Sequence, residues 1–272
     1  MYNVADHKDK YTLLQQIRVH VVGCPRSGTT LMTELLRYAY DFAGAAPHER
    51  PLFDQIPSNL SPYLSKKPAD TIRIGKAFAA DENLYVIALI RDPRAVISSV
   101  HWSHPDVYFV GYARWRFYAQ TINAHKDHPR YLVLRYEDLL HDPNGVQQKV
   151  SEHLPFLQQT RAFDEYPEGI ETLHDHSEKA LGGVRPFDTS RINSWQEHLG
   201  RIRREFEANS DFQNDLEKLG YEENDDWTKQ FADVKASGSS YKDSVDQWPK
   251  KWETAFRNWR KSRRYIRQRR LS

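Results

Sequence analysis

The chain has 272 residues, of which 39% are hydrophobic and 28% charged, a balance typical of a soluble protein with one α/β domain or one domain plus extensions. It has no run of 18 apolar residues that would predict a transmembrane helix, and its first residues lack the apolar stretch of a signal peptide. Cys24 is the only cysteine, which excludes an internal disulfide and favours a reducing, cytoplasmic location.

The net charge of +2 is unevenly distributed. Residues 250–272 contain ten Lys or Arg and one Glu, so this tail carries +9 and the rest of the chain carries −7. The acidic body argues against a nucleic-acid-binding surface, and we expect no nucleic-acid partner.

The first predicted elements are a strand, a glycine-bounded loop and a helix. Residues 17–23, IRVHVVG, are short, β-branched and apolar, as expected for a buried strand. Residues 29–42 predict a helix because their leucines recur on one face. The loop between them, GCPRSGTT, has the spacing of the phosphate-binding loop G-x-x-x-x-G-K-[ST], but Thr29 stands where the lysine belongs.

The missing lysine changes which anion this loop can hold. In P-loop kinases and nucleotidases that lysine reaches the β- and γ-phosphates of the nucleotide. Arg26 supplies a cation from another position of the loop, and Thr29 and Thr30 supply hydroxyl groups. With the backbone N–H groups and the helix N-terminus, these residues favour a smaller anionic group held by hydrogen bonds.

Two more strand–helix units follow. Residues 84–90, LYVIALI, predict a strand buried on both faces, and Pro93 after it suits the first turn of a helix. Residues 130–139 predict a third strand and the start of a helix with Asp138 as its N-cap. The pattern predicts an α/β fold, a P-loop-type three-layer sandwich with a central parallel sheet flanked by helices.

The remaining chain is less regular. Residues 161–195 are expected to be mostly loop, and residues 198–219 predict one helix that a glycine ends. The predicted domain organisation is a main domain over residues 1–227, a polar linker over 228–247 and a basic, aromatic helix over 248–272.

In this C-terminal helix Trp252, Phe256 and Trp259 share one face, which Tyr265 and Ile266 extend. Basic residues crowd the other sides. Such a helix either lies in a membrane interface beside anionic lipid or packs its aromatic residues on the main domain. Packing is the commoner arrangement, and peripheral membrane contact is the alternative expectation.

The sequence PRSGTTL, residues 25–31, resembles the 5′-phosphosulfate-binding loop of the sulfotransferases that use 3′-phosphoadenosine 5′-phosphosulfate (PAPS). The resemblance is closest to the bacterial and Golgi branch, which includes tyrosylprotein and carbohydrate sulfotransferases. It implies that Arg26 contacts the sulfuryl group. It also implies that the 5′-phosphate is cradled by Ser27, Gly28, Thr29 and Thr30.

The segment IRDPRAVISS resembles the 3′-phosphate motif of the same family, an Arg at a strand end and a Ser eight residues later. Arg91 and Ser99 have that spacing. Arg91 leaves the sheet at the edge where open α/β sheets bind ligands, and its planar guanidinium suits a phosphate.

Two catalytic residues follow from the resemblance to the tyrosylprotein-type branch, which has a catalytic Glu about twenty residues after the loop arginine. Glu49 lies twenty-three residues after Arg26 and is assigned as the general base, with His48 as the rival. Lys66 precedes Arg91 by twenty-five residues and is assigned to stabilise the transition state, with Lys67 as the alternative.

A late segment, VRPFDTSRINSW, loosely resembles the part of the family that folds over the nucleotide. Arg191 is assigned to cofactor binding, and Arg185, Ser190 and Ser194 are further candidates. Trp195 either stacks on the adenine or belongs to the core.

The resemblance implies an enzyme that moves the sulfuryl group from PAPS to an acceptor hydroxyl by in-line transfer with a carboxylate base, without metal, and releases 3′,5′-ADP. The acceptor is a glycan, lipid, tyrosine or small molecule, and the aromatic residues of 101–120 are candidates to line its site. His174 and His176 lack partners at the spacing of a metal site. The alternatives are a P-loop kinase or nucleotidase and a non-catalytic, PAPS-binding, membrane-associated adaptor; the sequence indicates no oligomeric state.

Overall fold

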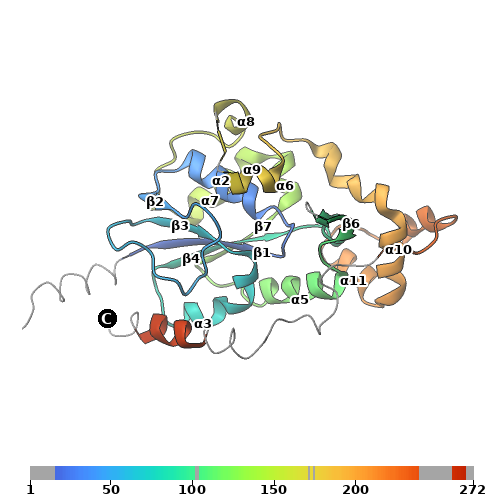
Figure 1. Ribbon diagram of the computed structural model, residues 1–272, viewed down its shortest axis with the longest axis horizontal. Helices are drawn as coiled ribbons and strands as arrows, with labels where there is room; N and C mark the ends of the chain where they lie inside the picture. Colours follow the sequence, from blue (N-terminus) through green and yellow to red (C-terminus); the bar gives the residue numbers. More distant parts are fainter. Residues whose placement is uncertain (1–15, 102–103, 171, 174, 239–258, 268–272) are drawn as a thin grey trace, which may run out of the picture.

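The computed structural model describes residues 16–101, 104–170, 172–173, 175–238 and 259–267. Its centre is a five-stranded sheet with the order β2-β3-β1-β4-β7, in which all paired strands run parallel (Figure 1). The strands are β1 (Arg18–Gly23), β2 (Gly44–Ala45), β3 (Tyr63–Lys66), β4 (Leu84–Ile90) and β7 (Tyr131–Arg135).

Helices cover both faces of the sheet, which confirms the three-layer sandwich (Figure 1). One face is covered by α2 (Thr29–Ala39), α6 (Tyr136–His141), α7 (Pro143–His153), α8 (Tyr166–Gly169) and α9 (Asp175–Leu181). The opposite face is covered by η1 (Pro68–Arg73), α3 (Ile74–Phe78) and α5 (Tyr112–Asn123).

Further elements lie beyond the carboxyl ends of the strands. They are α4 (Pro93–Ile97), the hairpin β5 (Val100–His101) with β6 (His104–Tyr108), η2 (Thr189–His198), α10 (Leu199–Ala208), α11 (Phe212–Lys218) and η3 (Asp226–Phe231). Their apolar side chains form a separate cluster with Trp115 of α5, in which Phe212 and Trp227 take part. The sheet has its own core on each face, with Leu35 and Ile87 in one and Ile74 and Val86 in the other.

The predicted strands match closely, but several helices differ. The strand at 84–90 is confirmed at both ends, and the helix predicted over 29–42 ends at Ala39. The single helix predicted over 198–219 is wrong, because α10 and α11 are separated at residues 209–211. On a straight helix, side chains six residues apart in the sequence point in directions about 120° apart. The break between α10 and α11 lets both Phe206 and Phe212 reach Trp227.

Two local predictions are corrected. Residues 161–195 hold α8, α9 and most of η2, so this segment is more helical than expected. Asp138 is not the N-cap of α6, because the cap position is Arg135 and Asp138 lies inside the first turn. By contrast, Pro93 occupies the first turn of α4 as predicted, and the Asp92 carboxylate before it accepts from Arg94 N.

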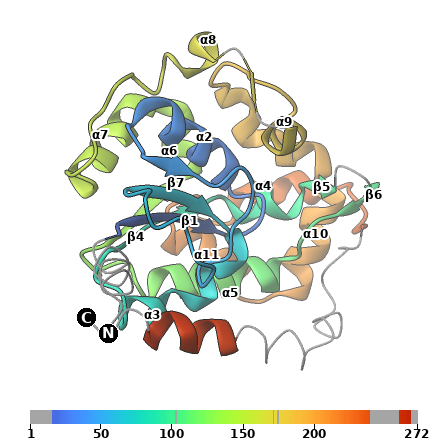
Figure 2. The same cartoon turned by 60° about the vertical axis from the view of Figure 1, so that its left-hand side comes forward.

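The described part of the C-terminal helix, residues 259–267, packs beside α3 (Figures 1 and 2). Tyr265 is only 7% exposed and belongs to the core cluster of that face. Its ring packs against Phe53 with the centroids 5.4 Å apart. The predicted aromatic residues Trp252 and Phe256 lie outside the described residues, as do residues 239–247 of the predicted linker.

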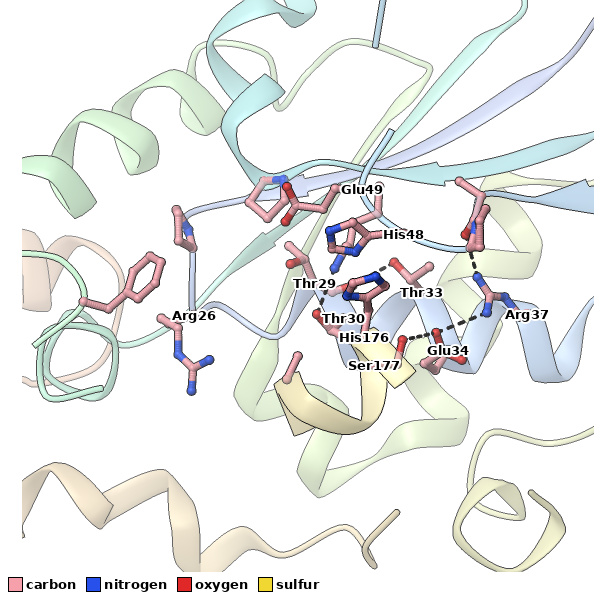
Figure 3. A pocket seen from close by; sticks show the side chains of 17 residues that line it. Arg26, Thr29, Thr30, Thr33, Glu34, Arg37, His48, Glu49, His176 and Ser177 are labelled. Atoms are coloured by element: carbon pink, nitrogen blue, oxygen red, sulfur yellow. Dashed lines mark hydrogen bonds and ion pairs between the residues drawn. The ribbon is translucent and has the colours of Figure 1, made fainter. Parts of the chain in front are cut away.

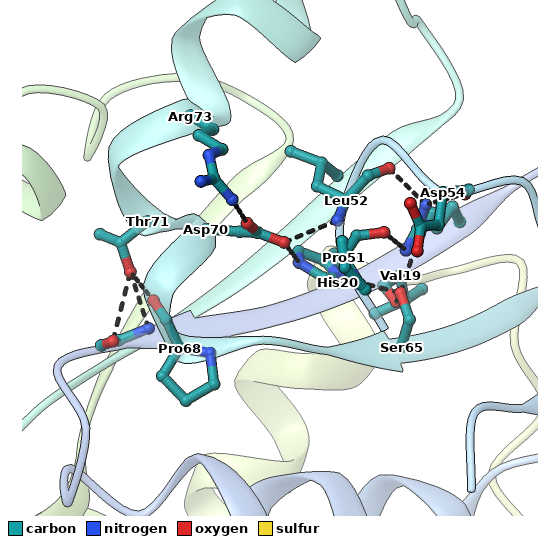
Figure 4. Close-up of polar contacts among 12 residues, drawn as sticks. Val19, His20, Pro51, Leu52, Asp54, Ser65, Pro68, Asp70, Thr71 and Arg73 are labelled. Carbon is teal, nitrogen blue, oxygen red and sulfur yellow. Dashed lines mark hydrogen bonds and ion pairs between the residues drawn. The ribbon is translucent and has the colours of Figure 1, made fainter. Parts of the chain in front are cut away.

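A buried polar network lies between β1, β3 and η1 (Figure 4). His20 Nδ1 is 2.8 Å from Ser65 Oγ, and its Nε2 is 3.4 Å from Asp70 Oδ2. Burial lowers the pKa of His20 to about 4 although Asp70 opposes this. Burial acts to raise the pKa of Asp70, but His20, the Leu52 N–H and Arg73 lower it to about 2, so at neutral pH His20 is neutral and Asp70 is ionised.

We therefore predict that the free energy of unfolding falls as the pH drops from 6.5 to about 4. In this window the unfolded chain binds a proton at His20 and the folded chain does not, which gives a loss of about 3 kcal/mol. Urea unfolding at several pH values measures it. The same measurement on His20→Gln separates the contribution of His20 from that of the other histidines. If the free energy of unfolding falls equally with pH in both proteins, the prediction is contradicted.

Candidate active site

The phosphate-loop sequence forms a tight connection between β1 and α2. β1 ends at Gly23, and Gly28 precedes α2 with a φ of 91°, in the left-handed region that favours glycine. A Cβ atom on Gly28 would lie 2.3 Å from Tyr136 Cδ2, so this position has no room for a side chain. The loop is therefore pressed against the start of α6, and its backbone N–H groups lie at the N-terminus of an eleven-residue helix.

Three residues of the two predicted binding motifs meet beside this loop. Arg26 Nε donates to Ser99 Oγ at 2.6 Å, and Arg91 Nη1 donates to the Arg26 carbonyl at 3.0 Å. The guanidinium of Arg91 also lies over the Tyr136 ring, 4.3 Å from its centroid. The structure thus brings the loop together with Arg91, which follows β4, and Ser99, which lies just beyond the end of α4 and not within a helix as the sequence suggested.

A cavity of about 230 Å³ opens on the other side of the loop (Figure 3). Of the predicted residues, its lining includes Arg26, Thr29, Thr30, Glu49 and Lys66. Lys66 Nζ donates to Thr30 Oγ1 at 2.9 Å, which ties the end of β3 to the first turn of α2. Burial lowers the pKa of Lys66, while the charges of Glu49 and Glu34 oppose this shift.

Between the two lysine candidates, Lys66 is the one that lines the cavity. Lys67 instead occupies the N-cap position of η1, and its backbone N–H donates to the Val21 carbonyl. The alternation of side chains along a strand explains why neighbouring lysines face different surroundings.

The segment that carries His48 and Glu49 runs beside β3. Ala46 N donates to the Leu64 carbonyl at 2.9 Å, and Arg50 N donates to the Lys66 carbonyl at 3.0 Å. These bonds fix both ends of the turn from which His48 and Glu49 project. Both side chains are exposed and line the cavity.

His48 has a partner that the sequence did not indicate. Its ring stacks on that of His176 from α9, with the centroids 4.0 Å apart (Figure 3). Burial, followed by the neighbouring His176, lowers the pKa of His48. One face of the His48 ring is therefore already covered by His176.

Sequence reasoning missed the wall opposite Glu49. Glu34, 3% exposed, accepts from Ser177 Oγ at 2.7 Å and lies 3.4 Å from Arg37 Nη1. Arg37 Nη2 donates to the Ala46 carbonyl at 2.8 Å. The three-residue spacing of Glu34 and Arg37 was a signal for a pair on one helix face, but nothing in the sequence brought α9 to them.

Arg185, Ser190 and Trp195 of the late segment do not line the cavity. Arg185 donates to the Gly182 carbonyl, and Ser190 Oγ donates to Asp188. Trp195 is 3% exposed and belongs to the core, where Arg94 stacks on it. The side chain of Arg191 lies outside the described part of the structure.

The aromatic segment 101–120 divides between core and cavity. Tyr112, Trp115 and Tyr118 are buried, whereas Phe109 lines the cavity. Within the described ranges, no group of three or more His, Cys, Asp or Glu is placed to hold a metal ion. His174 lies outside those ranges.

The profile of the sulfotransferase domain matches residues 16–178, more than half of the chain, so the protein belongs to the sulfotransferase family. This assignment confirms the family expected from the loop motifs and disfavours the kinase or nucleotidase alternative. The specific branch stays a prediction. A comparison with curated protein sequences found no significant match.

The chain is also similar to solved structures at low sequence identity. The sulfotransferase domain of the curacin biosynthetic pathway is 17% identical, with a TM-score of 0.50 over 76% of this chain and 98% of that one. The sulfotransferase domain of the Synechococcus olefin synthase is also 17% identical, with a TM-score of 0.48 over 67% and 88% of the two chains. A mouse sulfotransferase in complex with PAP is 13% identical, with a TM-score of 0.45 over 83% and 90%.

Proposed function

We propose that the protein transfers the sulfuryl group of PAPS to a hydroxyl group of an acceptor. The observation that carries this proposal is the meeting of Arg26, Lys66 and Glu49 around one cavity at the N-terminus of α2. Two cations are thereby placed beside a phosphate-type loop, and a carboxylate faces the same space.

The structure offers polar groups that fit the donor. Ser27 Oγ and Arg91 Nε are buried without a hydrogen-bond partner, and such groups are rare unless a ligand or solvent completes them. Residues 27–30 and the N-terminus of α2 would hold the 5′-phosphate. Arg91 and Ser99 would hold the 3′-phosphate through charge-assisted hydrogen bonds.

The proposed chemistry is one displacement at sulfur. The acceptor oxygen forms a bond to sulfur while the bond from sulfur to the 5′-phosphate oxygen breaks, and 3′,5′-ADP leaves. Glu49 takes the proton of the acceptor hydroxyl. Arg26 and Lys66 neutralise the charge of the transferred group, a role in which preorganised cations lower the barrier.

Glu49 is a better candidate for the base than His48. Both residues line the cavity, but one face of the His48 ring is covered by the stacked His176 ring. Glu49 lies near enough to Lys66 for their charges to interact, so the carboxylate and the cation share the same end of the cavity.

We further propose that the C-terminal helix makes peripheral contact with anionic membranes. Trp259 is 50% exposed, and Arg263 lies over its ring at 4.6 Å. Arg267 continues the same stripe one turn later, and its side chain is exposed. An exposed Trp beside arginines is the composition of an interfacial helix. None of the helices in the described ranges has the length and apolar character to cross a membrane.

For the donor site, we predict that Arg91→Ala weakens binding of 3′,5′-ADP by about 1.5–3 kcal/mol, because the 3′-phosphate loses a charge-assisted contact. The preference for 3′,5′-ADP over 5′-AMP should fall with it, and calorimetry measures both. Arg161→Ala removes another exposed arginine and serves as the control. Unchanged discrimination in Arg91→Ala would show that Arg91 does not bind the 3′-phosphate.

For the base, we predict that Glu49→Gln lowers turnover by about 10²–10⁴-fold and leaves 3′,5′-ADP affinity unchanged. Transfer of ³⁵S from labelled PAPS to a panel of hydroxyl acceptors measures turnover. His48→Ala should have the smaller effect, and Glu82→Gln, an exposed glutamate elsewhere, should have none. A larger loss in His48→Ala would assign the base to the histidine, and tight PAPS binding without transfer by the parent would favour an adaptor.

For the membrane contact, we predict that the full chain sediments with phosphatidylserine vesicles at low salt and not with neutral vesicles. Each arginine near an anionic surface contributes about 1 kcal/mol. The combined change Trp259→Ala, Arg263→Ala and Arg267→Ala should abolish sedimentation. If the parent protein stays in the supernatant with anionic vesicles, the helix serves only to pack on the main domain.

A further inference from the structure

The segment that presents Glu49 continues into a short stretch, residues 51–54, which the protein holds from the inside. Arg18, 1% exposed, donates to the carbonyls of Pro51, Leu52 and Asp54. Leu52 N donates to Asp70 Oδ2 at 2.6 Å. A buried arginine with its donors on backbone carbonyls fixes the course of this stretch, since a buried charge is costly to leave unpaired.

The same stretch is held from the outside by the C-terminal helix. Lys261 Nζ donates to Asp54 Oδ1 at 2.5 Å, and the Tyr265 ring packs on Phe53. The Tyr265 hydroxyl donates to the Asp81 carboxylate, which fastens the helix to the main domain. Lys261 and Tyr265 are one helical turn apart, so one side of the helix makes these contacts while Trp259, Arg263 and Arg267 occupy another.

We propose that the C-terminal helix is part of the active-site framework, with Lys261 and Tyr265 as positioning residues for the segment that carries Glu49. Residues 51–54 lie between the Arg18 side chain on the inside and the helix on the outside. Arg50 is the only residue between this stretch and Glu49. Its backbone N–H donates to the carbonyl of Lys66, the last residue of β3. Release of the helix therefore loosens the far end of the turn that holds Glu49 opposite Lys66.

The consequence for catalysis differs from a loss of the donor site. The phosphate loop, Arg91 and Ser99 are fixed by β1, β4 and α6, and none of their contacts described above involves the C-terminal helix. Loosening of residues 46–54 should therefore lower kcat and leave donor binding intact. This inference rests on the proposed role of Glu49 for its effect on kcat, but the structural coupling can be measured without any acceptor.

Hydrogen exchange of the full-length protein tests the coupling. In the Lys261→Ala and Tyr265→Ala variants, the backbone amides of residues 46–54 should exchange about tenfold faster than in the parent protein. Peptides covering residues 18–30 should exchange at the parent rate. Affinity for 3′,5′-ADP should remain within about twofold of the parent value, because the donor contacts are preserved. Arg264→Ala, which removes another exposed cation from the same helix, is the matched control and should leave exchange unchanged.

Three results would overturn the proposal. If the amides of residues 46–54 exchange at the same rate in Tyr265→Ala as in the parent protein, the helix does not hold this segment. A uniform rise in exchange across the whole domain would show general destabilisation without a positioning role. If exchange rises locally while kcat stays at the parent value, the helix holds the segment but does not position Glu49, and the positioning role fails. The assignment of Glu49 as the base is tested separately by Glu49→Gln.

Discussion

Strand β1 forms parallel hydrogen-bonded pairs with β3 on one side and β4 on the other, and this pairing brings the proposed site together. The register aligns Val21 with Lys66 and Gly23 with Leu89. Three chain segments far apart in the sequence therefore leave the sheet at the same edge: the phosphate loop, the end of β3 and the end of β4. Because a parallel sheet places all carboxyl ends together, Lys66 and Arg91 reach opposite sides of one loop.

The cations around the loop have different surroundings. Arg91 lies beside Tyr136 and the Arg26 carbonyl, whereas Lys66 lies near Glu49 at the cavity, which Arg26 also lines. Lys66 is half-buried, and nearby carboxylates oppose the fall of its pKa that burial causes. A cation held this way is oriented before a substrate arrives, which is the condition for electrostatic preorganisation.

The strand–loop–helix unit was predictable because its signals are local. Gly23, Gly28 and the apolar strand before them lie within a dozen residues, and their spacing reflects backbone constraints at one turn. Lys66 and Glu49 were assigned only through the resemblance to a family. Composition and periodicity did not reveal β3, because a strand of four residues carries too short a pattern.

Other features depended on tertiary contacts that no local pattern encodes. The stack of His48 on His176 and the bond from Ser177 to Glu34 join segments more than a hundred residues apart. The break between α10 and α11 serves aromatic packing around Trp227, which lies beyond the second helix in the chain. Tyr265 belongs to an amphipathic helix that suits either packing or a membrane surface, and its burial could only be learned from the fold.

The contact between Lys261 and Asp54 spans 207 residues, which has a consequence for the order in which the molecule is built. During synthesis the strands, the phosphate loop and both halves of the sheet can assemble before residue 261 is made. Domains commonly fold from the N-terminus as the chain emerges, and contacts of large sequence separation form late. Residues 51–54 therefore gain their contacts with Arg18 early and their contacts with the C-terminal helix last. A chain that ends between the sheet and the helix would have an assembled phosphate loop beside a turn that lacks its outer support.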